Sequence, residues 1–395
     1  MTSVTKDTIA EALRDPELPD VVRRVLEIRT ALGKTSVAKY STMLVAHCQD
    51  HRLRGILQFY GANRSGRWAG RLVQTHNLAK NTLPDLALAR ELAAEGDFET
   101  MGTLFGETAF VFSELIRTAF IPSEGCRFIV SDFSAIEARV LAWLAGEDWV
   151  LEAFRNGKDI YCETASMMYH VPVEKHGANS HLRQKGKVAV LACGYQGGVG
   201  AMKRMDKGGS IPEDELQSVV DQWRQANSNS VKLWRTCELA ARTAIEEHRT
   251  VRLKNGLAFG YINGNLFIKL PGGRKLCYWN TRLKLDPRDG REHIVYMGVN
   301  QETKQWGETE TYGGKLVENI VQATARDCLA ISMQRVAALG YNIVMHVHDE
   351  IIVDCPIEDT GAMERINACM AEPIPWAPGL PLRGDGYETP FYMKD

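Results

Sequence analysis

The 395-residue sequence lacks several features that would assign it to a simple class. It has no uncharged apolar run near the roughly 20 residues that a membrane-spanning helix needs. No apolar segment follows its N-terminus, where charge begins at Lys6, so we expect no secretory signal. Its nine cysteines are scattered without a C-x-x-C pair, which argues against disulfide frameworks and zinc ribbons and favours a reducing compartment. The net charge of −2 shows no basic excess, although basic residues can still line one cleft.

The composition that remains is ordinary for a soluble globular protein, with 45% hydrophobic and 24% charged residues. This length allows a large core or two to three subdomains, and we find no internal repeat. Apolar spacing predicts mainly helices in residues 1–60, 147–205 and 212–249, and one long helix over 313–340.

Apolar runs predict strands at three places. "CRFIVSDF" is expected to be a strand that leads into a helix at "AIEARVLAWLAGE". Residues 256–285 are expected to form strands with a turn at Asn263-Gly264. "VMHVHDEIIVD" is expected to be a hairpin, whereas the Arg-, Asn- and Gly-rich segment 61–81 is expected to be a loop.

The tip of that hairpin carries two adjacent carboxylates, Asp349 and Glu350. In an extended chain they point to opposite faces, so one of them can face a given site directly. If Asp349 meets Asp132, at the end of the earlier strand, the pair suits divalent metal ions with positions left for phosphates. An ordinary charged turn is the alternative, although the tip lacks Asn-Gly or Asp-Gly.

Two acids near the earlier strand have structural alternatives of their own. For Asp132 alone, two interpretations are equally favoured: an acid that interacts with the dipole at a helix start, and a functional carboxylate held by a rigid strand. Ser134 and Glu137 have the S-x-x-E spacing of a capping box, and taken alone that interpretation is favoured over a function.

A regular spacing of four residues marks "RQKGKVAVLACGYQG", with Arg183, Lys187, Leu191 and Tyr195 on one drifting helix face. Two cations one turn apart suit a triphosphate, Arg through its fork of donors and Lys as a point charge. A solvated basic turn is the better interpretation of an isolated R-x-x-x-K. The glycines that follow do not form G-x-x-x-x-G-K-[ST].

Taken together, "VSDFSAIEARV", "RQKGKVAVLACGYQG" and "HVHDEIIVD" resemble motifs A, B and C of family A DNA polymerases, in the right order and with fitting separations. "SGRWAGRLVQTHNL" resembles the palm segment before motif A, and "ENIVQATARD" resembles the helix before motif C. The resemblance covers nearly the whole chain and is strongest to the polymerase half of bacteriophage-type members.

The resemblance implies an α+β fold of the right-hand polymerase type. A helical thumb remnant would occupy residues 1–60, and the palm, a small antiparallel sheet with helices, would be built from 61–145 and 312–395. Mainly helical fingers with a β-rich segment would be inserted at 146–311.

The resemblance also implies site residues in three groups: catalytic and metal-binding Asp132, Phe133, Asp349, Glu350 and Lys187; nucleotide-binding Arg183, Lys187, Leu191, Tyr195 and Glu137; and DNA-binding Arg67, Gln322 and His348. Two Mg²⁺ ions, with Mn²⁺ as the alternative, would be held by Asp132, Asp349 and the Phe133 carbonyl. Glu137 would be the steric gate that crowds a ribose 2′-hydroxyl. The implied partners are primer-template DNA and deoxynucleotides, with no membrane. The implied place is the cytoplasm of a bacterial host.

Some positions depart from the family pattern. Leu191 replaces the aromatic residue that packs on the nucleotide sugar in relatives, Ala135 stands where Gln is usual, and Gln196 replaces a common glycine. Only about sixty residues precede the palm, with no carboxylate set for an exonuclease and little room for a thumb. We therefore expect weak grip on duplex DNA and low processivity, unless a partner chain supplies thumb, exonuclease or processivity function.

Other functions remain open on the residues alone. A metal-dependent nuclease would use the same carboxylates but needs no triphosphate site. A catalytically silent or partner-dependent DNA-binding remnant would have no physical need for both aspartates and the Arg-Lys pair. Glu137 speaks against an RNA polymerase, whereas the use of an RNA template stays open.

Overall fold

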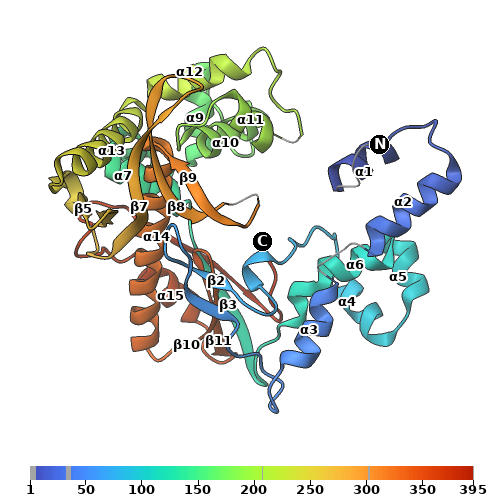
Figure 1. The fold of residues 1–395 in the computed structure, drawn as a ribbon. Helices are drawn as coiled ribbons and strands as arrows, with labels where there is room; N and C mark the ends of the chain where they lie inside the picture. The colour runs from blue at the N-terminus through green and yellow to red at the C-terminus, as the bar shows by residue number, and fades with distance from the viewer. Residues whose placement is uncertain (1–5, 33–36, 207, 301–302, 395) are drawn as a thin grey trace.

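The computed structural model describes residues 6–32, 37–206, 208–300 and 303–394. Helices and antiparallel sheets make up the structure, which confirms the expected α+β class. A four-stranded sheet lies between the N-terminal helices and a second body of helices with a six-stranded sheet (Figure 1). Across the described residues, no helix combines the length and apolar character that crossing a bilayer requires.

The four-stranded sheet has the order β10-β11-β3-β12, with every neighbouring pair antiparallel. Its strands are β3 (Cys126–Phe133), β10 (Asn342–Val347), β11 (Glu350–Pro356) and β12 (Gly384–Thr389). This confirms the strand predicted at "CRFIVSDF" and the predicted hairpin. The consecutive apolar residues of β3 and β11 are buried on both faces of the sheet, which explains why their patterns are continuous instead of alternating.

Three helices cover this sheet or extend from it. They are α7 (Ile136–Ala145), α14 (Gly313–Ala338) and α15 (Ala362–Ala371). The long helix predicted over 313–340 is therefore confirmed as α14, and side chains along its length are buried. At its start, Gly314 lies so close to Tyr195 that a Cβ would be 2.4 Å from the Tyr195 carbonyl oxygen. The Gly314 amide donates to Gln196 Oε1 at 2.9 Å, which fixes α14 against the chain that leaves α10.

The second body contains the helices predicted within 147–205 and 212–249. They are α8 (Asp148–Arg155), α9 (Ile160–Tyr169), α10 (Leu182–Cys193), α11 (Val199–Met205), α12 (Leu216–Ala226) and α13 (Ser228–Glu247).

A six-stranded antiparallel sheet follows, in sequential order from β4 to β9. Its elements are β4 (Val251–Arg252), η3 (Lys254–Gly256), β5 (Ala258–Ile262), β6 (Asn265–Lys269), β7 (Lys275–Asp286), β8 (Arg291–Val299) and β9 (Trp306–Thr311). The predicted Asn263-Gly264 turn joins β5 to β6, with both residues at positive φ as a two-residue hairpin turn requires.

The N-terminal part is mainly helical, as predicted. Its helices are α1 (Lys6–Leu13), α2 (Asp20–Leu32) and α3 (Ala38–Ala46), followed later by α4 (Leu86–Glu95), α5 (Phe98–Phe105), α6 (Thr108–Leu115) and η2 (Ile116–Ala119). Residues 1–5 and 33–36 of the first predicted helical segment lie outside the described residues.

The loop prediction for 61–81 is wrong in part. The segment enters a short hairpin of β1 (Leu57–Ala62) and β2 (Arg67–Gly70), followed by η1 (Thr75–Asn77). Tertiary packing accounts for the hairpin, because the Trp68 ring lies 4.6 Å from the His346 ring and 3.8 Å from the Arg326 guanidinium. No local hydrophobic pattern carries this information.

Candidate active site

The end of β3 meets the turn between β10 and β11. Strand register places Asp132 opposite Glu350 on one side and Asp385 on the other. The Phe133 amide donates to the Asp349 carbonyl at 3.1 Å, which locks the strand end to the hairpin tip. The two segments predicted to converge therefore lie side by side, although more than two hundred residues separate them in sequence.

Asp132 and Asp349 face the same cavity and repel each other electrostatically. Burial and the nearby Asp349 charge raise the pKa of Asp132. Burial also raises the pKa of Asp349, although Lys394 opposes that rise. Asp132 Oδ1 is buried and makes no hydrogen bond within the described structure. An orphaned carboxylate oxygen beside a second carboxylate is a donor set that fits a divalent cation with oxygen ligands.

Glu350 is the cross-strand partner of Asp132 and is 2% exposed. Its Oε1 accepts a short hydrogen bond from the Tyr392 hydroxyl, and the Lys394 ammonium donates to its Oε2 at 3.2 Å. Both Glu350 oxygens therefore accept a hydrogen bond from a residue near the end of the chain. Lys394 also lies 3.6 Å from Asp132 Oδ2. Neither Tyr392 nor Lys394 was expected at the site, because they lie near the end of the chain without a motif.

A cavity of about 480 Å³ extends from the two aspartates toward α7, α10 and α14. Among its lining residues are seven of the predicted site residues, namely Asp132, Phe133, Glu137, Leu191, Tyr195, Gln322 and Asp349. Leu191 is 43% exposed and offers an apolar side chain to this space.

Glu137 does not cap its helix. Residue Ala135, at positive φ, occupies the N-cap position of α7, and no side chain caps the helix there. Glu137 instead accepts a 2.8 Å hydrogen bond from the Tyr195 hydroxyl and lies 3.7 Å from Arg67. The capping-box interpretation is therefore wrong, because the strand turns into the helix through Ala135 and the acid contacts Tyr195 in the segment after α10.

Helix α14 adds two polar residues to the same cavity. Gln322 was predicted there, and its amide donates to Glu318 Oε1 at 3.3 Å. Burial and the nearby Glu137 charge raise the pKa of Glu318, whereas Arg67 opposes that rise. Glu318 was missed, because an acid on the face of a long helix is ordinarily a solvated surface residue.

Arg183 and Lys187 do not line the cavity. The Arg183 guanidinium pairs with Asp159 at 2.8 Å and lies 5.2 Å from the ring of Tyr161, which does line it. The Lys187 ammonium forms no ion pair or hydrogen bond with any residue that the structure describes. Asp159 and Tyr161 belong to the start of α9, and sequence reasoning missed both.

His348 forms the turn between β10 and β11 at positive φ and is exposed. A 3.2 Å contact joins its Nε2 to the His76 carbonyl oxygen. This contact holds the hairpin tip against η1, so the predicted DNA-contacting histidine lies at the surface beside the aspartates.

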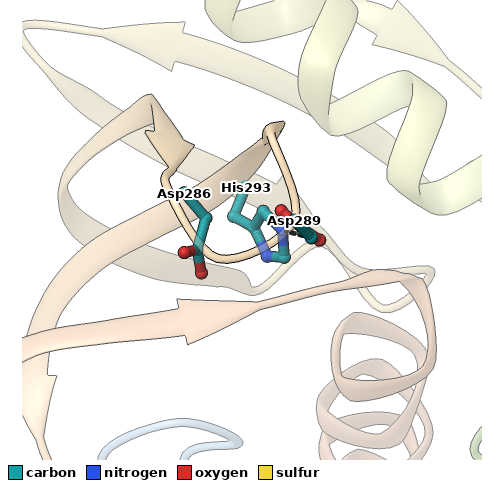
Figure 2. A group of neighbouring side chains, drawn as sticks. All are labelled: Asp286, Asp289 and His293. Carbon is teal, nitrogen blue, oxygen red and sulfur yellow. Dashed lines mark hydrogen bonds and ion pairs between the residues drawn. The ribbon is translucent and has the colours of Figure 1, made fainter.

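The described residues hold one compact group of three metal-type side chains, and it lies elsewhere. Figure 2 shows Asp286, Asp289 and His293 gathered where β7 turns into β8. Arg288 already pairs with Asp286, and His293 contacts Asp289 at 3.0 Å and Glu310 at 2.5 Å. These contacts account for the cluster as a charged hairpin turn.

The sequence also matches known proteins. Residues 108–251 match DNA polymerase family A. The DNA polymerase of Bacillus phage SP02 is 52% identical over 396 residues, which cover all of this chain and 61% of that relative. The thermostable DNA polymerase I of Thermus aquaticus is 29% identical over 255 residues, which cover 64% of this chain and 25% of the relative.

A solved structure has the same fold. The POL domain of Pol1 from M. smegmatis, in complex with DNA primer-template and dNTP, matches with a TM-score of 0.64 and 17% identity. The match covers 98% of this chain and 56% of that one. This chain thus spans less than two thirds of the length of each of these relatives.

Proposed function

Residues 108–251 match DNA polymerase family A, and from that match we propose that the chain belongs to this family and is a DNA-directed DNA polymerase. It would extend a primer 3′-hydroxyl with deoxynucleotides selected by a template. The convergence of Asp132 and Asp349 at the end of one cavity carries this proposal. The 52% sequence identity to the DNA polymerase of Bacillus phage SP02 further supports a role in phage DNA replication within a bacterial host.

In this proposal the palm would comprise 61–145 and 312–395, the fingers 146–311 and a thumb remnant 1–60. Asp132 and Asp349, with the Phe133 carbonyl, would hold Mg²⁺ ions, and the orphaned Asp132 Oδ1 supports that role. Bound ions would lower the pKa of the primer hydroxyl and stabilise charge on the leaving pyrophosphate. Glu350 would support the site through its contacts with Tyr392 and Lys394.

The nucleotide would enter the cavity between α7 and α10. Arg183 would leave its ion pair with Asp159 and bind the nucleotide phosphates instead. The unpaired Lys187 ammonium would bind the same phosphates and protonate the leaving pyrophosphate. Leu191 would lie against the sugar and Tyr195 near the template base. Tyr195 would also hold Glu137 where it crowds a 2′-hydroxyl.

The duplex end would lie over α14 and the hairpin tip. Gln322 and Arg67 would donate to purine N3 and pyrimidine O2 in the minor groove, which every base pair presents. These contacts would test pair geometry without reading sequence. His348 would touch the primer end. The neighbour solved with primer-template and dNTP supports both substrates.

Primer extension tests the proposal and separates it from its rivals. A labelled primer on a DNA template is incubated with Mg²⁺ and dNTPs, NTPs or no nucleotide. Extension with dNTPs alone is expected, and Asp349→Ala is expected to abolish it while DNA binding in a mobility-shift assay persists. Primer shortening without nucleotides would indicate a nuclease. Bound but unchanged DNA would indicate a silent or partner-dependent chain.

Product length tests the expected weak grip on duplex DNA. If this chain alone holds DNA through few phosphate contacts, products from one binding event are short and shorten further as salt rises. Products thousands of nucleotides long from a single binding event would refute that expectation.

A further inference from the structure

The last described residues form a strap, which we define as residues 391–394, and two of them contact acids of the candidate active site. Tyr392 is fully buried, and its hydroxyl accepts a 2.6 Å hydrogen bond from Arg117 while donating to Glu350. The Lys394 amide donates to Asn81 Oδ1 at 3.2 Å. These contacts tie the strap to the body of the protein and bring Lys394 to the acidic site.

The Lys394 ammonium lies between two acids on neighbouring strands. It is 3.2 Å from Glu350 Oε2 and 3.6 Å from Asp132 Oδ2, with 24% of its side chain exposed. No other cation in the described part of the chain forms an ion pair with either acid. Burial disfavours the charge on Lys394, but Glu350 and Asp132 outweigh this effect and raise its pKa.

The two oxygens of Asp132 therefore differ. Oδ2 faces a fixed positive charge, whereas Oδ1 is buried without a partner. A divalent ion bound at Oδ1 would share the carboxylate with Lys394 and be repelled by it. Without an ion, the same ammonium offsets the repulsion among Asp132, Asp349 and Glu350.

We propose that Lys394 is a positioning residue that takes the electrostatic place of a cation beside Asp132 and so limits how tightly this site binds divalent ions. The proposal rests on the proposed function of the site. In this role, Lys394 stabilises the acidic site when no ion is bound. It also keeps ion binding weak enough to be reversible.

The test measures ion binding directly. Free Mn²⁺ is followed by electron paramagnetic resonance during titration of the DNA-free protein at fixed pH and salt. Lys394→Met keeps the apolar stem and removes the charge, so its Mn²⁺ dissociation constant is expected to fall roughly tenfold. Lys394→Arg keeps the charge and is expected to stay close to wild type. Lys203→Met, which breaks a 2.7 Å surface pair with Glu213, is the matched control and should not change binding.

A second readout separates the proposed role from simple packing. In EDTA, Lys394→Met is expected to melt at a lower temperature than wild type, because three acids then lack their cation. Saturating Mn²⁺ is expected to raise the melting temperature of Lys394→Met by more than that of Lys203→Met.

The outcomes distinguish failure of this inference from failure of the proposed function. If wild type binds Mn²⁺, Asp132→Ala loses that binding, and Lys394→Met binds with unchanged or weaker affinity, the inference alone is overturned. If wild type binds no Mn²⁺, or Asp132→Ala retains full binding, the metal role of Asp132 fails and this inference fails with it.

Discussion

The Tyr195 hydroxyl donates a 2.8 Å hydrogen bond to Glu137 Oε2 and so joins the segment that follows α10 to the first turn of α7. Burial and the Glu137 charge raise the pKa of Tyr195 well above its usual value, so the phenol remains a donor at neutral pH. Arg67 lies 3.7 Å from the other Glu137 oxygen. The acid is therefore held from two sides at the cavity wall.

This arrangement predicts how sugar selection depends on Glu137. Glu137→Ala opens the wall and is expected to raise ribonucleotide incorporation relative to deoxynucleotide incorporation by at least tenfold, equivalent to about 1.4 kcal/mol. Tyr195→Phe removes only the hydrogen bond and is expected to relax selection less. Single-nucleotide incorporation with dNTP and NTP measures both. Unchanged selectivity in Glu137→Ala would remove Glu137 from the gate.

Leu191 gives a prediction about nucleotide affinity. Its side chain is 43% exposed in the cavity, so a larger apolar ring can be accommodated without rebuilding the core. Leu191→Phe is expected to lower the KM for dNTP several-fold by burying more apolar surface against the sugar, and Leu191→Ala to raise it. Steady-state incorporation at varied dNTP checks the pair. If the two variants do not change the KM in opposite directions, Leu191 does not contact the sugar.

The contacts of Asp159 give a third prediction, about nucleotide affinity, because its two carboxylate oxygens have different partners. Oδ1 accepts from the Tyr161 and Cys162 amides and caps α9, whereas Oδ2 binds Arg183. Asp159→Asn keeps the cap but loses the ion pair. It is expected to lower the KM for dNTP about two- to tenfold, because the phosphates no longer compete with a carboxylate for Arg183.

Two further variants check the role of Asp159. Arg183→Ala is expected to raise the KM for dNTP. Asp159→Ala removes the cap and is expected to destabilise the protein by about 1 kcal/mol in urea unfolding. If Asp159→Asn raises the KM instead, the carboxylate orients Arg183 and does not compete for it.

Much of the frame could be predicted because local pattern and final burial agree. Continuous apolar runs become β3 and β11, helical spacing becomes α14, and Asn263-Gly264 supplies the turn that its residue types favour. The meeting of Asp132 with the hairpin tip followed from strand geometry together with the resemblance.

The missed contacts have a common physical cause. Lys394, Asp159 and Glu318 act through partners that tertiary packing brings together, and their own neighbourhoods in sequence are unremarkable. Gln196 was expected only as a departure from a glycine, but its side-chain oxygen accepts a hydrogen bond from the Gly314 amide in the first turn of α14. A capping box was favoured for Glu137 because spacing alone cannot show that Ala135 makes the turn.

The last prediction concerns stability and comes from His346. This residue is 6% exposed, with its ring against Trp68 and its Nδ1 buried without a partner in the described structure. Burial, with the Arg326 charge, lowers the pKa of His346 from 6.5 to about 4. The unfolded chain therefore binds a proton between these pH values that the folded protein excludes. Burial of the neutral His346 ring therefore does not reduce the free energy of unfolding above about pH 6.5, and reduces it progressively as the pH falls toward 4.

Replacing the imidazole with a ring that does not titrate should remove that loss. The free energy of unfolding of His346→Phe, measured by urea at pH 8, 6.5 and 5, is expected to fall less than that of wild type. The difference should reach about 1–3 kcal/mol at the acid end, because each pKa unit is worth roughly 1.4 kcal/mol. His176→Phe, at an exposed position, is the matched control. Parallel curves for wild type and His346→Phe would mean that His346 accepts a proton without cost, and its burial against Trp68 would then not govern acid stability.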